Sequence, residues 1–211
     1  MFADRVDAGR QLAAKMGAYR GNSNVVLLAL PRGGVVVAAE IARELDLALD
    51  IVVPRKIGAP GNPEYAIGAI TEDGESLFDE RAIAALGISP EYIAQTVYEE
   101  QREAERRMNV YRGGRPPLNV THKTAILVDD GVATGATMRV AIRSVRKRGA
   151  ATIIVAVPVI ALDTLEILRR EADEVISVDA PLLFGAVGAF YESFPQTSDE
   201  EVMKILEMSK A

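Results

Sequence analysis

The chain has 211 residues, 49% of them hydrophobic, with a formal net charge of −6, no cysteine and a single histidine, His122. This composition predicts one globular domain and excludes disulfide frameworks, zinc–thiolate sites and multi-histidine metal sites. The acidic balance argues against a nucleic-acid-binding protein, and no segment reaches the ~18 to 20 apolar residues of a membrane-spanning helix, so we expect a soluble cytoplasmic protein without a membrane partner.

Apolar runs alternate with helical periodicities along the chain, a pattern typical of α/β proteins with a mostly parallel, twisted sheet flanked by helices. The expected strands are 25–30, 51–54, 125–128, 152–157 and 175–178. A β-hairpin is expected from 65–71 and 75–78 around an Asp-Gly turn. The expected helices are 3–19, 36–45, the segment from Thr137 to Gly149, and 162–171.

Residues 80–113 are predicted to be a helical insertion. Ser89 and Pro90 form a cap and first-turn signal, and the long helix that they begin is expected to end near Tyr111. Its charged stretch 99–103 is interpreted as a solvated face with pairs of opposite charge.

Two adjacent carboxylates, Asp129 and Asp130, end the apolar run 125–128. The loop 133–137 behind them consists of small residues and leads into a basic amphipathic helix. Free amides at a helix N-terminus bind phosphate, and two carboxylates beside them suit the vicinal hydroxyls of a sugar, with Mg²⁺ nearby. The pattern predicts a ribose 5-phosphate site. The alternative is a ligand-free Asp-Gly turn whose helix is capped by Thr134 or Thr137.

Basic residues follow two earlier strands. Arg32, Gly33 and Gly34 come directly after the strand 25–30, where two glycines open the backbone for a large anion and the arginine supplies a cation. Arg55 and Lys56 end the strand 51–54 and are therefore expected at the same sheet edge. The Gly/Pro-dense loop 57–64 after them is a candidate lid but is short, and the helical insertion 80–113 is the alternative cover. For Arg55 and Lys56 themselves, the alternative is two solvated basic residues at a strand end.

The segment 125–137 resembles the phosphoribosyl pyrophosphate (PRPP) signature of type I phosphoribosyltransferases. By this resemblance, Asp129 and Asp130 hold the ribose hydroxyls. The 5-phosphate is assigned to the loop that follows, made of Ala133, Thr134, Gly135, Ala136 and Thr137. The resemblance assigns pyrophosphate to Arg32, Gly33 and Gly34, and it implies a cis peptide bond before Arg32. Gly131 departs from the aliphatic residue that most members carry.

The resemblance covers roughly residues 20–180 and implies a pentosyl-transferring glycosyltransferase of nucleotide metabolism. Such an enzyme transfers the phosphoribosyl group of PRPP to a nitrogenous base and releases pyrophosphate with the help of Mg²⁺. Asp129, Asp130, Arg55 and Lys56 would then be catalytic, and the two aspartates are also candidate Mg²⁺ ligands, directly or through water. The basic pair resembles that of orotate phosphoribosyltransferases. The whole chain is most similar to bacterial and archaeal predicted phosphoribosyltransferases whose acceptor is unsettled.

The acceptor is expected at a small hood built from the termini, mainly residues 179–211, within a single domain that spans 1–211. Phe184, Phe190 and Tyr191 are candidates to stack on a planar base, and packing of this segment onto the core is the alternative. Purine-salvage members carry an aspartate where this chain has Ala133, which argues against a hypoxanthine or guanine enzyme. A PRPP- or nucleotide-sensing regulator without turnover is the competing function. A homodimer is left open.

Overall fold

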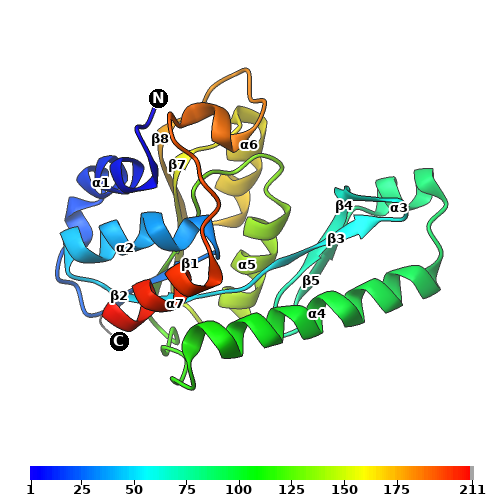
Figure 1. Ribbon diagram of the computed structural model, residues 1–211, viewed down its shortest axis with the longest axis horizontal. Helices are drawn as coiled ribbons and strands as arrows, with labels where there is room; N and C mark the ends of the chain where they lie inside the picture. Colours follow the sequence, from blue (N-terminus) through cyan, green and yellow to red (C-terminus); the bar gives the residue numbers. More distant parts are fainter. Residues whose placement is uncertain (210–211) are drawn as a thin grey trace.

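The computed structural model describes residues 1–209, and its centre is a five-stranded parallel sheet (Figure 1). The strand order across this sheet is β2-β1-β6-β7-β8. The strands are β1 (Val25–Ala29), β2 (Ala48–Ile51), β6 (Thr124–Val128), β7 (Thr152–Val159) and β8 (Glu174–Asp179). The inner strands are almost entirely buried, as strands covered on both faces must be. The predicted fold class is confirmed.

Helices cover both faces of this sheet, and alternate residues of each strand point into two separate apolar clusters. Leu27 and Ile126 lie in the first cluster, whereas Leu28 and Leu127 lie in the second. The first cluster is covered by α1 (Arg5–Lys15), α2 (Gly33–Leu45) and α7 (Asp199–Met208), and the second by α5 (Ala136–Lys147) and α6 (Leu162–Glu171). None of the helices within residues 1–209 combines the length and apolar character needed to cross a bilayer.

A second, antiparallel sheet projects from the parallel one, and we call residues 55–88 the arm (Figure 1). The arm contains β3 (Arg55–Ala59), β4 (Asn62–Ile70), β5 (Ser76–Phe78) and α3 (Glu80–Leu86), with an apolar cluster of its own. The long helix α4 (Pro90–Arg112) packs on both units. Ile93 and Val97 contact the arm cluster, whereas Ala104 and Met108 lie in the main core. One helix thus ties the arm to the sheet.

The prediction for residues 51–64 was wrong. The strand β2 ends at Ile51, and Arg55 and Lys56 begin the arm strand β3 instead of ending a strand of the parallel sheet. The expected lid loop 57–64 is largely a hairpin of β3 and β4. Gly58 serves close packing there, since a Cβ on it would lie 2.6 Å from the Pro63 Cα. The glycines and prolines that suggested a flexible loop therefore build a bulged, tightly packed strand pair.

A buried ion pair anchors the end of α4 to the parallel sheet. Arg112 donates two hydrogen bonds to the Asp50 carboxylate of β2, at 3.1 and 2.9 Å. Asp50 also accepts from the Leu118 backbone N–H at 2.9 Å. The side chains of Arg112 and Asp50 are only 14% and 9% exposed. Removing either partner would leave a buried charge without compensation.

We therefore expect Asp50→Ala to lower the free energy of unfolding by about 3–5 kcal/mol, the cost of breaking a buried pair. Urea denaturation measures this loss in the free energy of unfolding. The matched control is Glu166→Ala, because the Glu166–Arg169 pair is 58% and 57% exposed and its loss should stay within about 0.5 kcal/mol. Equal effects of the two substitutions would contradict this account of the anchor.

Candidate functional site

The acidic pair, Asp129 and Asp130, and the glycine loop, residues 32–34, meet at the carboxyl edge of the parallel sheet. The strands β1 and β6 are neighbours in register, with Ala29 opposite Val128, so the segments that follow them lie side by side. A Cβ on Gly33 would lie 1.8 Å from Asp130 Oδ2, and one on Gly34 would lie 2.8 Å from the Asp129 Cα. Only glycines fit this contact. The two segments therefore share one edge of the sheet, and the Pro31–Arg32 peptide bond is cis, as expected.

The two carboxylates sit in different electrostatic environments. Burial raises the pKa of the Asp129 carboxyl well above its ordinary value, and the charge of Asp130 adds to the increase. Asp129 Oδ1 accepts the backbone N–H of Asp130 at 2.8 Å. Asp130 Oδ2 accepts from Arg5 Nε at 2.7 Å. Arg5, near the start of the chain, was not among the predicted site residues, because no local motif surrounds it.

The loop 133–137 leads into α5 with an uncapped N-terminus. Gly135 takes the N-cap position with a φ of 77°, no side chain caps the first turn, and no acidic residue lies in it. The capping alternative for Thr134 and Thr137 is therefore not what the structure contains. Thr164 of α6 donates to the Ala133 carbonyl from the other side and fixes the loop at its start. The arrangement can hold an anion through backbone amides.

Gly131 is the position where the sequence departs from the family signature. A Cβ there would lie 2.5 Å from Val187 Cγ1 and 3.0 Å from Val159 Cγ1. Val187 belongs to the short 3-10 helix η2 (Val187–Phe190) in the C-terminal segment. The Val187 side chain occupies the space that an aliphatic side chain at position 131 would need. Val187 therefore fills the volume that Gly131 leaves open.

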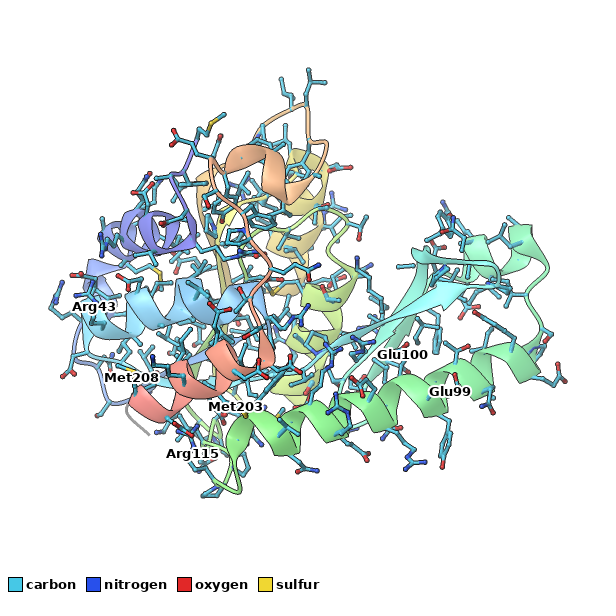
Figure 2. All side chains as sticks on the ribbon, in the orientation of Figure 1. Arg43, Glu99, Glu100, Arg115, Met203 and Met208 are labelled. Carbon is cyan, nitrogen blue, oxygen red and sulfur yellow. The ribbon has the colours of Figure 1, made fainter. Side chains whose placement is uncertain are left out.

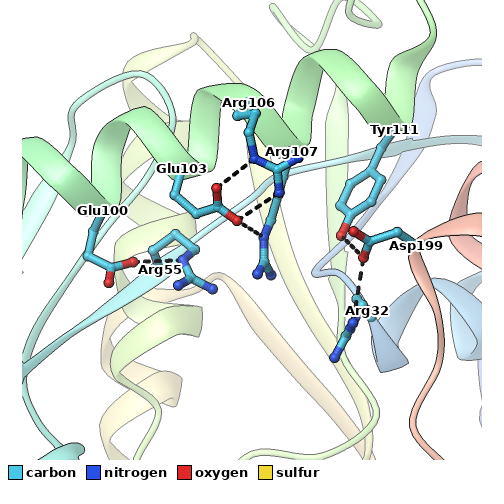
Figure 3. Close-up of polar contacts among 8 residues, drawn as sticks. All are labelled: Arg32, Arg55, Glu100, Glu103, Arg106, Arg107, Tyr111 and Asp199. Carbon is cyan, nitrogen blue, oxygen red and sulfur yellow. Dashed lines mark hydrogen bonds and ion pairs between the residues drawn. The ribbon is translucent and has the colours of Figure 1, made fainter.

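Arg32 of the glycine loop forms an ion pair with Asp199. Its Nη1 lies 3.6 Å from Asp199 Oδ1, at the start of α7 (Figure 3). The same carboxylate accepts a hydrogen bond from the Tyr111 hydroxyl of α4 at 2.7 Å. Burial, together with the bond to Asp199, raises the pKa of Tyr111 to about 12. The contact between Asp199 and Arg32 depends on how α7 packs against the core.

Arg55 and Lys56 face different surroundings on the arm. Arg55 Nε lies 2.8 Å from Glu100 Oε2 of α4 (Figure 3). Glu99 and Glu100 lie midway along this helix (Figure 2). The predicted solvated face thus includes one residue, Glu100, that pairs across to the arm. Lys56 is exposed and lines a cleft of about 800 Å³ between the arm and α5, which also borders Thr134 and Ala136.

The three aromatic residues predicted to bind the acceptor lie in different surroundings. Tyr191 is 6% exposed, packs against Phe2 and Phe194, and donates its hydroxyl to the Asp130 carbonyl. This burial is at odds with the predicted stacking role of Tyr191. Phe190 packs on Phe184 with ring centroids 5.1 Å apart. Phe184 also lines a second cleft, of about 810 Å³, with Ala133 and Thr134. The last two residues of the predicted hood lie outside the described residues.

The donor set at the acidic pair fits Mg²⁺ only in part. Among the residues whose side chains the structure describes, no group of three or more His, Cys, Asp or Glu is arranged to hold a metal ion. Asp129 and Asp130 offer two carboxylates, and one oxygen of Asp130 already binds Arg5. Mg²⁺ is commonly held by one or two carboxylates, waters and substrate phosphates together, so these residues fit a shared site but not a complete protein cage.

The Val187 contact gives a stability prediction. We expect Gly131→Ala to lower the free energy of unfolding by about 1–3 kcal/mol, because the new methyl group overpacks against Val187. Adding Val187→Ala should remove the overlap, so the double variant should lose less than the sum of the two single losses. Thermal or urea unfolding measures this coupling. Gly17→Ala is the control, since a Cβ there meets nothing within 4 Å. Strict additivity would contradict the proposed packing.

Comparisons with known proteins identify the family to which the chain belongs. A sequence model of the phosphoribosyl transferase domain matches residues 3–182. Two Mycobacterium tuberculosis proteins, "Putative phosphoribosyl transferase MT0597" and "Putative phosphoribosyl transferase Rv0571c", are each 41% identical over 98% of the chain, which spans 46% of their length. The crystal structure of TT1426 from Thermus thermophilus is 41% identical, with 99% of each chain covered and a TM-score of 0.81. The chain belongs to the phosphoribosyl transferase domain family.

Proposed function

We propose that the protein is a PRPP-dependent phosphoribosyltransferase that transfers a 5-phosphoribosyl group to a nitrogenous acceptor and releases pyrophosphate. One observation carries this proposal: the acidic pair touches the glycine loop on one side and leads into an uncapped helix on the other. Places for sugar hydroxyls, for a leaving anion and for a terminal phosphate are thus contiguous. A ligand with these three parts in this order is PRPP.

The ribose and its 5-phosphate are assigned to the segment after β6. Asp129 and Asp130 accept hydrogen bonds from the 2- and 3-hydroxyls of the ribose. The 5-phosphate binds at the N-terminus of α5, where amides and the helix dipole favour an anion. The residues assigned to it are Ala133, Thr134, Gly135, Ala136 and Thr137. Support comes from the exposure of Thr134 and from the absence of a side-chain cap on this helix.

The pyrophosphate is assigned to Arg32, Gly33 and Gly34, with Arg55 and Lys56 as further cations from the arm. Arg32 and Arg55 are each paired with a carboxylate, Asp199 and Glu100 respectively. The side chains of these pairs are between 26% and 37% exposed, and pairs open to water contribute little stability. Exchanging a protein carboxylate for a pyrophosphate oxygen is therefore energetically easy. Lys56 has no such partner among the described residues.

The chemical step breaks the bond between carbon 1 of the ribose and the pyrophosphate oxygen while a nitrogen of the acceptor bonds to carbon 1. Positive charge develops on the ribose ring and negative charge on the departing pyrophosphate. The carboxylates of Asp129 and Asp130 stabilise the ring, whereas Arg32, Arg55 and Lys56 stabilise the leaving group. Asp129 and Asp130 would be the residues that hold Mg²⁺ together with the substrate, and the ion would supply additional neutralisation of the leaving group.

The acceptor is assigned to the cleft that Phe184 lines beside the phosphate loop. This cleft borders Ala133 and Thr134, so an acceptor there would be close to the bound ribose phosphate. Phe190 supports the ring of Phe184 from behind, and Tyr191 is too deeply packed to take part. Ala133 offers no carboxylate to the acceptor, unlike the aspartate of purine-salvage enzymes.

The proposal is tested by incubating the protein with PRPP, Mg²⁺ and a panel of purine, pyrimidine and other nitrogenous bases. Release of pyrophosphate that depends on one base would support transfer and would identify the acceptor. Binding of PRPP without pyrophosphate release by any acceptor would favour the alternative, a PRPP- or nucleotide-sensing protein without turnover. No binding of PRPP would refute both the transferase and a PRPP-sensing protein.

Replacing Asp129 and Asp130 with asparagine should weaken PRPP binding about tenfold or more for each charge-assisted hydrogen bond that is lost. Transfer should be abolished. Isothermal titration calorimetry measures the affinity. Glu99→Gln is the matched control because it makes the same chemical change on an exposed stretch of α4. An unchanged PRPP affinity in the double variant would defeat the assignment of the ribose hydroxyls.

The N-terminus of α5 should bind inorganic phosphate or sulfate even without PRPP, because its amides and dipole are already in place. Crystals soaked with phosphate should show density within hydrogen-bonding distance of the amides of residues 135–137. A loop that stays empty at high phosphate concentration, with these amides bonded to protein groups, would be the contrary result.

A further inference from the structure

The two ends of the described chain meet beside the acidic pair. Phe2 and Tyr191 form a parallel bridge, in which the Phe2 N–H donates to the Phe190 carbonyl and the Glu192 N–H donates to the Phe2 carbonyl, both at 2.8 Å. The Ser193 N–H continues the pairing to the Ala3 carbonyl at 3.0 Å. We call residues 2–5 and 190–195 the terminal brace. In Figure 1 the blue N-terminal segment and the orange C-terminal segment lie together above the sheet.

Arg5 extends from the brace to Asp130, and its guanidinium group is held by three separate contacts. Arg5 Nε donates a hydrogen bond to Asp130 Oδ2 at 2.7 Å, and Arg5 Nη1 donates one to the Pro195 carbonyl at 2.6 Å. The group also lies 3.7 Å from the centroid of the Phe194 ring. Arg5 is only 9% exposed. These contacts fix its orientation far more firmly than those of a surface arginine.

The contact gives the two oxygens of Asp130 different surroundings. Oδ2 lies between Arg5 and the surface of Gly33. Among the hydrogen bonds of residues 1–209, none from a nitrogen goes to Oδ1. The Asp130 carbonyl is held separately by the Tyr191 hydroxyl, which comes from the other half of the brace. Main chain and side chain are thus both fixed, and the Asp130 carboxylate also interacts with the side chain of Asp129.

Charge gives a second reason for Arg5 at this position. Asp129 and Asp130 are adjacent acids in a partly enclosed place, and a carboxylate there is costly without a cation beside it. Arg5 faces Asp130 directly, and its positive charge also acts on Asp129 and Tyr191. Arg32, the next cation in the site, is paired with Asp199 instead. Arg5 is therefore the cation in contact with the acidic pair within residues 1–209.

We propose that Arg5 is a positioning residue for PRPP binding: it holds Asp130 Oδ2 so that Oδ1 faces a ribose hydroxyl. This inference rests on the proposed function. It differs from a purely structural role in one respect. Arg5 acts on PRPP only through the Asp130 carboxylate, so its contribution should disappear when that carboxylate is removed.

A double-mutant cycle on PRPP affinity tests the inference. The variants are Arg5→Gln, Arg5→Lys and Asp130→Asn, alone and combined, with the dissociation constant measured by calorimetry and folding checked by thermal unfolding. Arg5→Gln should weaken PRPP binding about tenfold, the worth of one charge-assisted contact. Arg5→Lys should weaken it only about threefold, because the charge remains while the second hydrogen bond and the ring contact are lost.

In the Asp130→Asn background, neither substitution of Arg5 should change the affinity further. If Arg5→Gln does not fold, the milder Arg5→Lys carries the same cycle, since its threefold effect should also vanish in that background. Arg10→Gln is the control. Arg10 lies on the same helix and pairs with Glu40, but its side chain is 60% exposed, so PRPP affinity should not change.

Equal effects of an Arg5 substitution in both backgrounds would overturn the positioning role while leaving the proposed function intact. No effect of Arg5→Gln in the otherwise unchanged protein would also overturn it. If the unaltered protein binds no PRPP, the proposed function fails, and the positioning role fails with it.

Discussion

The parallel pairing of β1 with β6 is the constraint on which the candidate site depends. Because the two strands run in the same direction and in register, their carboxyl ends release two segments at one point of the sheet edge. One segment carries the glycine loop and the other carries the acidic pair. Because Gly33 and Gly34 have no side chains, the glycine loop can contact the acidic pair directly. A larger residue at either position would separate a cation-bearing loop from the carboxylates by at least the thickness of a methyl group.

Around this contact, the charges of the site are balanced inside the protein. Asp130 pairs with Arg5, Arg32 with Asp199, and Arg55 with Glu100. The first pair is the most enclosed, with side chains 10% and 14% exposed, whereas the other two are more open to water. Screening by solvent weakens the open pairs more than the enclosed one. If the proposed ligand assignment holds, a charged ligand would replace the protein carboxylates at Arg32 and Arg55 more readily than the carboxylate at Arg5.

The long helix α4 gives these open pairs a common support. It contributes Glu100 to Arg55, and Tyr111 to the carboxylate that holds Arg32 (Figure 3). The same helix packs on the arm near its start and on the main core near its end, where Arg112 anchors it to Asp50. The positions of the two cations thus depend on the same helix, although Arg32 follows β1 of the parallel sheet and Arg55 begins β3 of the arm.

The sequence predicted those parts of the site that are encoded locally. The acidic pair, the small-residue loop and the glycine loop each lie within a few residues of a buried strand, so hydrophobic periodicity was enough to place them. The hairpin of β4 and β5 was predicted, but the segment 55–64 was mispredicted because Gly58 and its neighbours carry the composition of a loop, whereas tertiary pairing makes them a bulged strand pair. The contacts that Arg5 and Tyr191 make with Asp130 could not be found by this reasoning. The two residues contact Asp130 from positions 125 residues before it and 61 residues after it, and only the packing of both terminal segments against the sheet brings them there.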